Sequence, residues 1–363
     1  MNVRALWMIL LTAWVLAGCE PAATDQSFAG LGQESAEGFT QPGPETGLRF
    51  PEDYGAHPDH RIEWWYLTAN LETDTGEPVG VQWTQFRQSL VPPAEQTDQN
   101  PESWPLGAVW MAHSALSFQG RHRFAERLAR DGIGQGGVEV EPFAVWLDHW
   151  QLEATEQSDT WRLQVDAGTD RPWGYDLTLQ LRRPPVAHGD NGFSAKSASG
   201  QGSMYFSLVD IRIEGEITLD GETYPVQGKG WFDREWSSQF LKAEQKGWDW
   251  FALHLDSGDK LMAFQLRDGQ GGYQAGTWIP AAGDPVTLGP GDFTLAPLAR
   301  RDNVPIRWRL TLPAQSLDLE VTAPEGRYLN EGLFPYWESP VRITGSHSGV
   351  GYMELTGYAT ESP

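Results

Sequence analysis

The stretch Ile306-Arg307-Trp308-Arg309-Leu310-Thr311-Leu312 alternates apolar and polar side chains, and Leu317-Asp318-Leu319-Glu320-Val321 repeats the alternation a few residues later. Successive side chains of a β-strand point to opposite faces. Each stretch would therefore bury one face and leave the other in water, as antiparallel sheets commonly do. The sequence predicts two neighbouring strands of an antiparallel sheet here.

The same two-residue period recurs over Tyr175–Leu181, Val209–Ile217 and Gly351–Tyr358. Turn sequences such as Asp220-Gly221 stand between successive runs at hairpin spacing. We therefore expect an all-β fold built from antiparallel strands.

The 363 residues are enough for two consecutive β-barrel domains packed together, 47–240 and 241–361. The one stretch with a helical pattern is short, at Phe124–Leu128. Segments rich in Pro or Gly, Arg183–Gly202 and Gly269–Gly291, are expected to be loops.

Residues 1–18 have the pattern of a secretory signal, one basic residue followed by an apolar run too short to span a bilayer. The run ends in Leu16-Ala17-Gly18-Cys19, which resembles the lipobox of bacterial lipoproteins and contains the chain's one cysteine. We expect lipidation at Cys19, a flexible tether over 19–46, and a periplasmic location. Because residue 20 is Glu and not Asp, the outer membrane is favoured over the inner membrane.

The charge excludes several classes of function. With 49 Asp and Glu against 26 Lys and Arg, the formal charge is −23, which repels nucleic-acid backbones. No glycine-rich phosphate loop precedes a helix, so no nucleotide cofactor is expected. His57 and His60 have a spacing that could bind metal, but no further ligands accompany them, and we predict no metal site. Gly200–Met204 has the wrong order for a hydrolase serine.

The 18 Trp residues are an unusual density, and several occur as pairs on strand-like segments. They could fill barrel cores, or they could wall an apolar cavity for a flat or greasy ligand. The candidate ligand-binding residues are Trp64, Trp65, Tyr66, Trp236, Trp248 and Trp250.

Six motifs give the chain a family resemblance: His57–Tyr66, Val81–Arg87, Met111–Ala115, Gly230–Trp236, Gly247–Phe251 and Gly351–Tyr358. Together they resemble the AttH/carotenoid 1,2-hydratase-like family of lipocalin-like proteins, from about Gly47 to Thr360. The resemblance implies two lipocalin-like barrels with a ligand site near their junction. The family includes carotenoid hydratases, relatives that perform cyclisations, and secreted lipoproteins described as hydrolases.

Two positions depart from the hydratase members of that family. Arg234 stands where those members have His, and Ala263-Phe264-Gln265 stands where they have Tyr-x-Asp. These two departures weaken the case for carotenoid hydration in particular.

Glu63 is a candidate general acid. On a strand it would share a face with Trp65 and Leu67, and burial among apolar side chains would raise its pKa. Alternatively, a buried Glu63 is neutralised by Arg87 or Arg267 and holds barrel strands in register.

Asp233 and Glu235 form a candidate carboxylate pair. An extended backbone places both on the face of Trp231, about 6.6 Å apart at Cα. Two acids at that range can divide the roles of proton donor and charge stabiliser. Alternatively, Arg234 or a backbone N–H group pairs with these carboxylates, and their role is structural.

His113 and His254 each fall on a strand face beside apolar or aromatic residues, so either could be a general base or a satisfied core residue.

The leading hypothesis is a lipid-anchored periplasmic protein that binds an apolar or amphipathic small molecule. It would either transform this ligand by cofactor-independent acid catalysis, such as hydration, isomerisation or cyclisation, or serve as a carrier or accessory lipoprotein of an envelope transport system. A glycosidase that uses a carboxylate pair is a third alternative.

Overall fold

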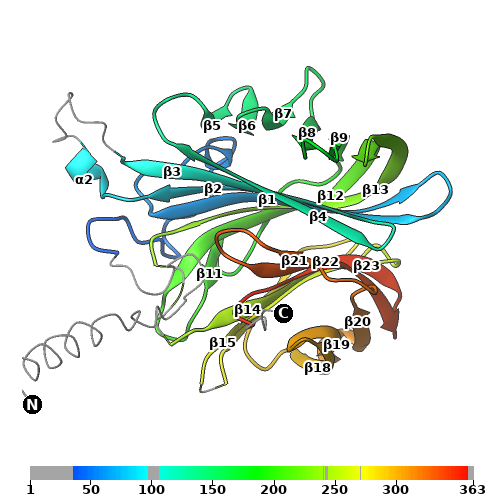
Figure 1. Ribbon diagram of the computed structural model, residues 1–363. Helices are drawn as coiled ribbons and strands as arrows, with labels where there is room; N and C mark the ends of the chain where they lie inside the picture. Colours follow the sequence, from blue (N-terminus) through cyan, green and yellow to red (C-terminus); the bar gives the residue numbers. More distant parts are fainter. Residues whose placement is uncertain (1–35, 97–105, 240, 242–243, 270, 359–363) are drawn as a thin grey trace, which may run out of the picture.

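Antiparallel strands make up nearly all of the regular secondary structure in the computed structural model, which describes residues 36–96, 106–239, 241, 244–269 and 271–358 (Figure 1). Residues 1–35 lie outside the described residues, and with them the predicted signal peptide, Cys19 and most of the predicted tether.

The first sheet has 13 strands, in the order β4-β3-β2-β1-β13-β12-β9-β8-β7-β6-β5, with β10 and β11 also pairing with β12. Its strands are β1 (Ile62–Thr73), β2 (Pro78–Ser89), β3 (Ala108–Phe118), β4 (Arg121–Arg130), β5 (Gly136–Val140), β6 (Phe143–Leu147), β7 (Trp150–Ala154), β8 (Thr160–Ala167), β9 (Trp173–Leu181), β10 (Val186–Ala187), β11 (Phe193–Ala195), β12 (Gly202–Leu219) and β13 (Glu222–Ser237).

The second sheet has 10 strands, in the order β17-β16-β15-β14-β23-β22-β20-β19-β18, with β21 pairing with β22. Its strands are β14 (Gly247–Leu255), β15 (Lys260–Arg267), β16 (Tyr273–Ile279), β17 (Val286–Leu288), β18 (Thr294–Arg301), β19 (Val304–Leu312), β20 (Leu317–Thr322), β21 (Leu329–Asn330), β22 (Tyr336–Gly345) and β23 (Gly349–Leu355).

Helices are short: the 3-10 helices η2 (Glu52–Tyr54) and η3 (Pro313–Gln315) and the α-helix α2 (Pro93–Gln96). Within the described ranges, no helix has the length and apolar character needed to cross a membrane.

The two sheets curl into a nearly closed barrel and a half-barrel, which confirms the predicted all-β fold with two barrel-like sheets. Each has its own apolar interior. The first interior contains side chains such as Trp65, Trp83 and Trp150, and the second contains Phe251 and Trp308. Both interiors are filled by side chains, as in small barrels generally.

A third apolar cluster joins the two sheets. Tyr66 and Trp231 of the first sheet pack with Trp250, Phe264 and Tyr352 of the second. In Figure 1, β21–β23 lie directly against the sheet that contains β1 and β4, in agreement with the contacts between β1 and β23 and between β2 and β22. Several strands near the junction are therefore buried on both faces.

The predicted strands at Ile306–Leu312 and Leu317–Val321 are confirmed as β19 and β20, which pair with each other antiparallel. The predicted helix at Phe124–Leu128 is wrong, because this segment is part of β4 and pairs with β3. Its side chains are mostly half-buried on both faces, so the sequence pattern does not distinguish a helix from a strand. Hydrogen bonding to the edge of β3 makes the segment a strand.

The two predicted loops also contain strands. Arg183–Gly202 includes β10 and β11, and Gly269–Gly291 includes β16 and β17. β10, β11 and β17 are only two or three residues long, and pairing with β12 or β16 stabilises them more than their local sequence does. β16 has seven residues and pairs with β15.

A buried ion cluster fixes β1 against its neighbours. Glu63 is fully buried, forms an ion pair with the fully buried Arg234 of β13, and lies 3.3 Å from Arg87 Nη1 of β2. The backbone N–H of His57 also donates to its carboxylate, at 2.9 Å. Burial alone would raise the pKa of Glu63, but Arg234, His57 and Arg87 together lower this pKa to about 2.

We predict that Glu63→Gln lowers the free energy of unfolding by about 3 to 5 kcal/mol, because it leaves buried guanidinium groups without a carboxylate. Urea unfolding followed by tryptophan fluorescence measures this. Asp318→Asn, which breaks an exposed ion pair with Arg309, is the matched control and should change stability little. Equal losses in the two variants would contradict a structural role for Glu63.

Candidate functional site

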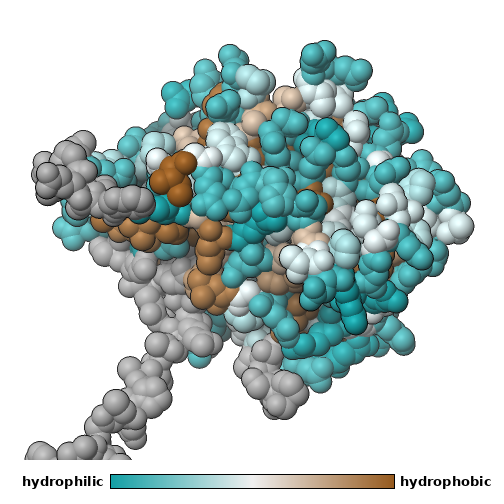
Figure 2. Space-filling view, turned by 45° about the horizontal axis from the view of Figure 1, so that its top comes forward, coloured by the Kyte–Doolittle hydropathy of each residue, from teal (hydrophilic) through white to brown (hydrophobic). Residues whose placement is uncertain are grey.

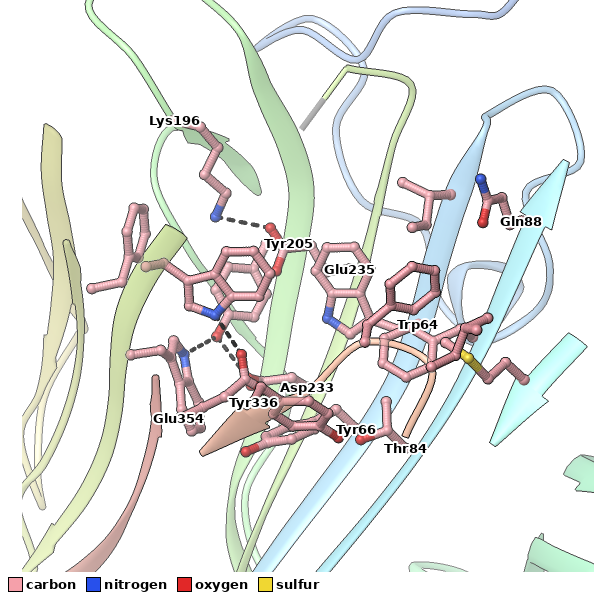
Figure 3. Close-up of a pocket in the computed structure, with 18 of the residues that line it drawn as sticks. Trp64, Tyr66, Thr84, Gln88, Lys196, Tyr205, Asp233, Glu235, Tyr336 and Glu354 are labelled. Carbon is pink, nitrogen blue, oxygen red and sulfur yellow. Dashed lines mark hydrogen bonds and ion pairs between the residues drawn. The ribbon is translucent and has the colours of Figure 1, made fainter. Parts of the chain in front are cut away.

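A cavity of about 170 Å³ lies between the two sheets and outside both barrel interiors (Figure 3). Strands of both sheets contribute to its wall, so neither half forms it alone. Its lining is mainly apolar and aromatic: Ile62, Trp64, Tyr66, Thr84, Phe86, Gln88, Val109, Met111, Leu128, Lys196, Tyr205, Asp233, Glu235, Trp248, Trp250, Phe264, Leu266, Leu333, Phe334, Tyr336 and Glu354.

Apolar side chains continue from the cavity to the surface. Leu128 and Leu333 line the cavity and are nevertheless 54% and 62% exposed. Figure 2 shows hydrophobic side chains gathered on one side of a face that is otherwise largely hydrophilic. An apolar molecule could therefore reach the cavity along an apolar path.

Strand alternation determines which side chains reach the cavity. On β1, Trp64 and Tyr66 line the cavity, whereas Trp65 points into the first barrel. On β14, Trp248 and Trp250 line it, whereas Phe251 points into the second interior.

Asp233 is the central carboxyl group of the cavity wall and is only 3% exposed. Its Oδ2 accepts a hydrogen bond from the Tyr205 hydroxyl at 2.7 Å, and its Oδ1 accepts from Trp231 Nε1 at 2.6 Å and from the Ser207 hydroxyl. Burial raises the pKa of Asp233 to about 7, although these three donors favour the ionised form. Asp233 can therefore gain and lose a proton near neutral pH.

A buried histidine positions one of these donors. His188 Nε2 lies 2.6 Å from the hydroxyl of Ser207, and its Nδ1 lies 2.8 Å from the hydroxyl of Thr277 in the second sheet. Burial lowers the pKa of His188 to about 3, so the ring is neutral. The orientation of Ser207 toward Asp233 thus depends on both sheets.

Glu235 forms an ion pair with Lys196, whose Nζ lies 2.8 Å from Glu235 Oε1. The Lys196 ammonium also lies 4.1 Å from the ring centre of Phe264. Burial lowers the pKa of Lys196, although Glu235 opposes the shift. The carboxylate of Glu235 therefore stabilises a buried ammonium group at one side of the cavity.

Glu354 is a second carboxyl group with a raised pKa in the wall. It lies on β23 directly opposite Glu338 of β22 and accepts a hydrogen bond from Trp248 Nε1. Burial raises the pKa of Glu354 to about 7, and burial together with Glu354 raises that of Glu338 well above its usual value. Two buried carboxyl groups this close do not both ionise. Glu338, which accepts from the Tyr66 hydroxyl at 2.8 Å, is therefore the neutral member at neutral pH.

His113 lies behind the cavity wall. Its Nδ1 is 3.0 Å from the hydroxyl of Tyr336, which does line the cavity, and its Nε2 is 2.9 Å from Glu126 Oε2. Burial lowers the pKa of His113. It can orient Tyr336, but it does not reach the cavity.

A model of the AttH-like family matches residues 41–358. The chain belongs to the AttH-like family. A crystal structure of a candidate AttH protein from Nitrosomonas europaea is 31% identical to this chain, with a TM-score of 0.76, and the match covers 88% of this chain and 100% of that one.

Kievitone hydratase from Nectria haematococca shares the fold, with a TM-score of 0.63 at 16% identity, over 89% of this chain and 97% of that one. No curated protein sequence matches this AttH-like chain.

Four of the predicted ligand-binding aromatics, Trp64, Tyr66, Trp248 and Trp250, line the cavity of this AttH-like protein. The other two do not. Trp65 packs in the first barrel, and Trp236 stacks on His57 with the ring centres 3.8 Å apart.

The predicted rise in the pKa of Glu63 is wrong. The alternative of neutralisation by arginine describes the structure, with Arg87 and Arg234 as the partners. Arg267 instead pairs with Asp249 of β14, at 3.2 Å. Arg234 does not satisfy the Asp233 carboxylate, because it faces the opposite side of β13.

The remaining histidines lie outside the cavity. His57 contacts Asp53 and Glu63, and the described ranges contain no group of three His, Cys, Asp or Glu side chains arranged to hold a metal ion. His254 is buried beside Trp231.

Sequence reasoning missed Glu354, Lys196 and Tyr205. Glu354 had a signal, because alternation along Gly351–Tyr358 places it on the same face as the aromatic Tyr352. Lys196 had none, since it lies in a segment that we expected to be a loop.

We predict a pH-dependent stability difference between wild type and Asp233→Asn. Asp233 stays protonated up to about pH 7 in the folded chain but only to about pH 4 when unfolded. The folded state then binds more protons than the unfolded state in this interval. The contribution of Asp233 to the free energy of unfolding therefore falls as pH rises, by up to about 1.4 kcal/mol per pH unit. Urea unfolding at a series of pH values measures the difference.

The free energy of unfolding of Asp318→Asn should change with pH in the same way as that of wild type over this interval. A constant gap between wild type and Asp233→Asn from pH 4 to pH 7 would show that Asp233 titrates normally.

Proposed function

We propose that this AttH-like protein binds an apolar or amphipathic small molecule in the cavity between its sheets and catalyses a proton-transfer reaction on it without a cofactor. Hydration, isomerisation and cyclisation are the reactions in this class. The observation that carries the proposal is the position of Asp233, a carboxyl group with a pKa of about 7 in an aromatic cavity wall.

The size of the cavity limits what it can enclose. An engineered apolar cavity of about 150 Å³ holds one benzene molecule, and this cavity measures about 170 Å³. The enclosed part of the ligand is therefore about one ring or one short branched end, and the rest would extend past Leu128 and Leu333. The lining favours an apolar group over a sugar.

Acid catalysis here would begin with transfer of the Asp233 proton to a carbon–carbon double bond of the ligand. The π electrons form the new C–H bond and leave a cation on the adjacent carbon, which the faces of Trp64 and Trp250 can stabilise. Attack by water followed by loss of a proton gives hydration. Loss of a proton from the next carbon gives isomerisation, and attack by a second double bond followed by proton loss gives cyclisation.

The proton must return to a carboxylate in each case. Asp233 after donation and Glu354, each with a pKa near 7, are suitable acceptors. Kievitone hydratase is named for a reaction in this class, but at 16% identity its likeness concerns the fold.

We predict that Asp233→Asn keeps ligand binding but loses about 10²-fold or more in rate, because the amide retains the shape and lacks the proton. Wild type and variant are incubated with small molecules extracted from the native envelope. Mass spectrometry then follows molecules that gain one water or change retention time at constant mass. Asp318→Asn is the control for general effects.

The alternative is a carrier or an accessory lipoprotein of an envelope transport system. If wild type retains a molecule from the extract and returns it unchanged, and Asp233→Asn behaves identically, the protein is a carrier and the catalytic proposal fails.

The location proposed for this activity is the periplasmic side of the outer membrane, through a lipid on Cys19. Two or more acyl chains suffice for stable anchoring. Cys19→Ala should release the protein from the membrane fraction or leave it as an unprocessed precursor, as seen by fractionation and intact mass. A correctly processed variant that stays in the membrane would refute the anchor.

A further inference from the structure

A second hollow, a groove of about 920 Å³, runs along the junction of the two sheets. Its wall includes Lys229 of β13, roughly 20 Å along the strand from the cavity residue Glu235. Strands β12 and β13 of the first sheet and β14 and β15 of the second contribute to it. It is therefore distinct from the ligand cavity.

The groove is cationic in a strongly acidic chain. Five Arg or Lys side chains line it against two carboxylates, a formal local charge of +3 where the chain carries −23. At physiological salt, charges beyond about 8 Å are largely screened. The nearby cations therefore outweigh the distant acids for an anion inside the groove.

Pairing in the sheets brings these positive charges together. Arg212 of β12 lies directly opposite Lys229 of β13, and both side chains are exposed. Across the junction, Lys260 of β15 adds a further positive charge to the groove wall. Like charges directly opposite each other destabilise a sheet unless a counter-charge lies between them.

Among the described residues, carboxylates neutralise only part of the positive charge of the groove. Lys260 lies 3.6 Å from Asp210 and Arg212 lies 3.9 Å from Glu214, but among the described residues Lys229 forms no ion pair. Burial lowers the pKa of His254 to about 3, and Lys260 and Lys229 contribute to the shift, as expected of a positive potential at the floor of the groove.

We propose that this groove binds a phosphate-bearing anion, held by Arg212, Lys229 and Lys260. Phosphate fits because it carries more than one charge and offers several acceptor oxygens to guanidinium and ammonium groups. The volume leaves room for an organic group attached to the phosphate. The source is either a soluble phosphate compound or a phospholipid head group.

Calorimetric titration of the full chain with inorganic pyrophosphate tests the proposal. We expect saturable binding that Lys229→Gln and Arg212→Gln each weaken about 10-fold or more, since each loses a charged hydrogen-bond donor. Arg342→Gln is the matched control, because it removes one exposed cation on β22, outside the groove. If all three variants bound pyrophosphate equally weakly, the effect would come from net charge alone, and the proposed site would be wrong.

Thermal unfolding distinguishes a role of Lys229 in anion binding from a structural role. Without pyrophosphate, Lys229→Gln should be as stable as wild type or more so, because it removes a like-charge pair. Pyrophosphate should raise the Tm of wild type and not that of Lys229→Gln. A lower Tm of Lys229→Gln without pyrophosphate would show that Lys229 is structural and contradict the proposal.

Flotation with vesicles distinguishes the two sources. If vesicles of phosphatidylglycerol in phosphatidylcholine bind wild type more than Lys229→Gln, and pure phosphatidylcholine vesicles show no difference, the head group is the ligand. If pyrophosphate binds and the vesicles do not discriminate, the ligand is soluble. If neither probe distinguishes Lys229→Gln from wild type, the groove is not an anion site.

Discussion

The site depends above all on the pairing register of β1 with β13. In this register Trp65 lies opposite Arg234 and Glu63 lies opposite Trp236, so these side chains share the inner face. The alternate residues of both strands, including Asp233, face the second sheet. A slip of one residue would exchange the two faces and turn Arg234 into the cavity. The buried ion pair between Glu63 and Arg234 resists that slip, because a slipped strand would leave both charges buried and unpaired.

Two buried carboxyl groups on opposite faces of these strands consequently behave in opposite ways. Burial by itself would raise the pKa of both carboxyl groups. Glu63 faces two guanidinium groups, and its pKa falls to about 2. The three groups that donate hydrogen bonds to Asp233 are neutral, and its pKa rises to about 7. The charge of the partner, and not the degree of burial, therefore separates a structural carboxylate from one that can transfer a proton.

Sequence alternation predicted strands such as β19 and β20 and the shared face of Asp233 and Glu235, because these depend on neighbours in the chain. The two barrel-like sheets were expected from the length of the chain and from the family resemblance. Alternation could not show that Lys196 pairs with Glu235, or that Glu354 is the second carboxyl group with a raised pKa, because distant segments bring those groups together. The error at Phe124–Leu128 has a similar origin. An edge strand with both faces half-buried has little periodicity, and its pairing with β3 is not visible locally.

The central claim is that Asp233 exchanges a proton near neutral pH inside the cavity. A carbon-13 NMR titration of the side-chain carboxyl groups in the full chain tests this directly, with Asp233→Asn used to assign the resonance. The account predicts that the resonance lost in Asp233→Asn has a midpoint near pH 7 and moves when an apolar ligand fills the cavity. A midpoint near pH 4, the ordinary value for aspartate, together with no response to ligand, would contradict it.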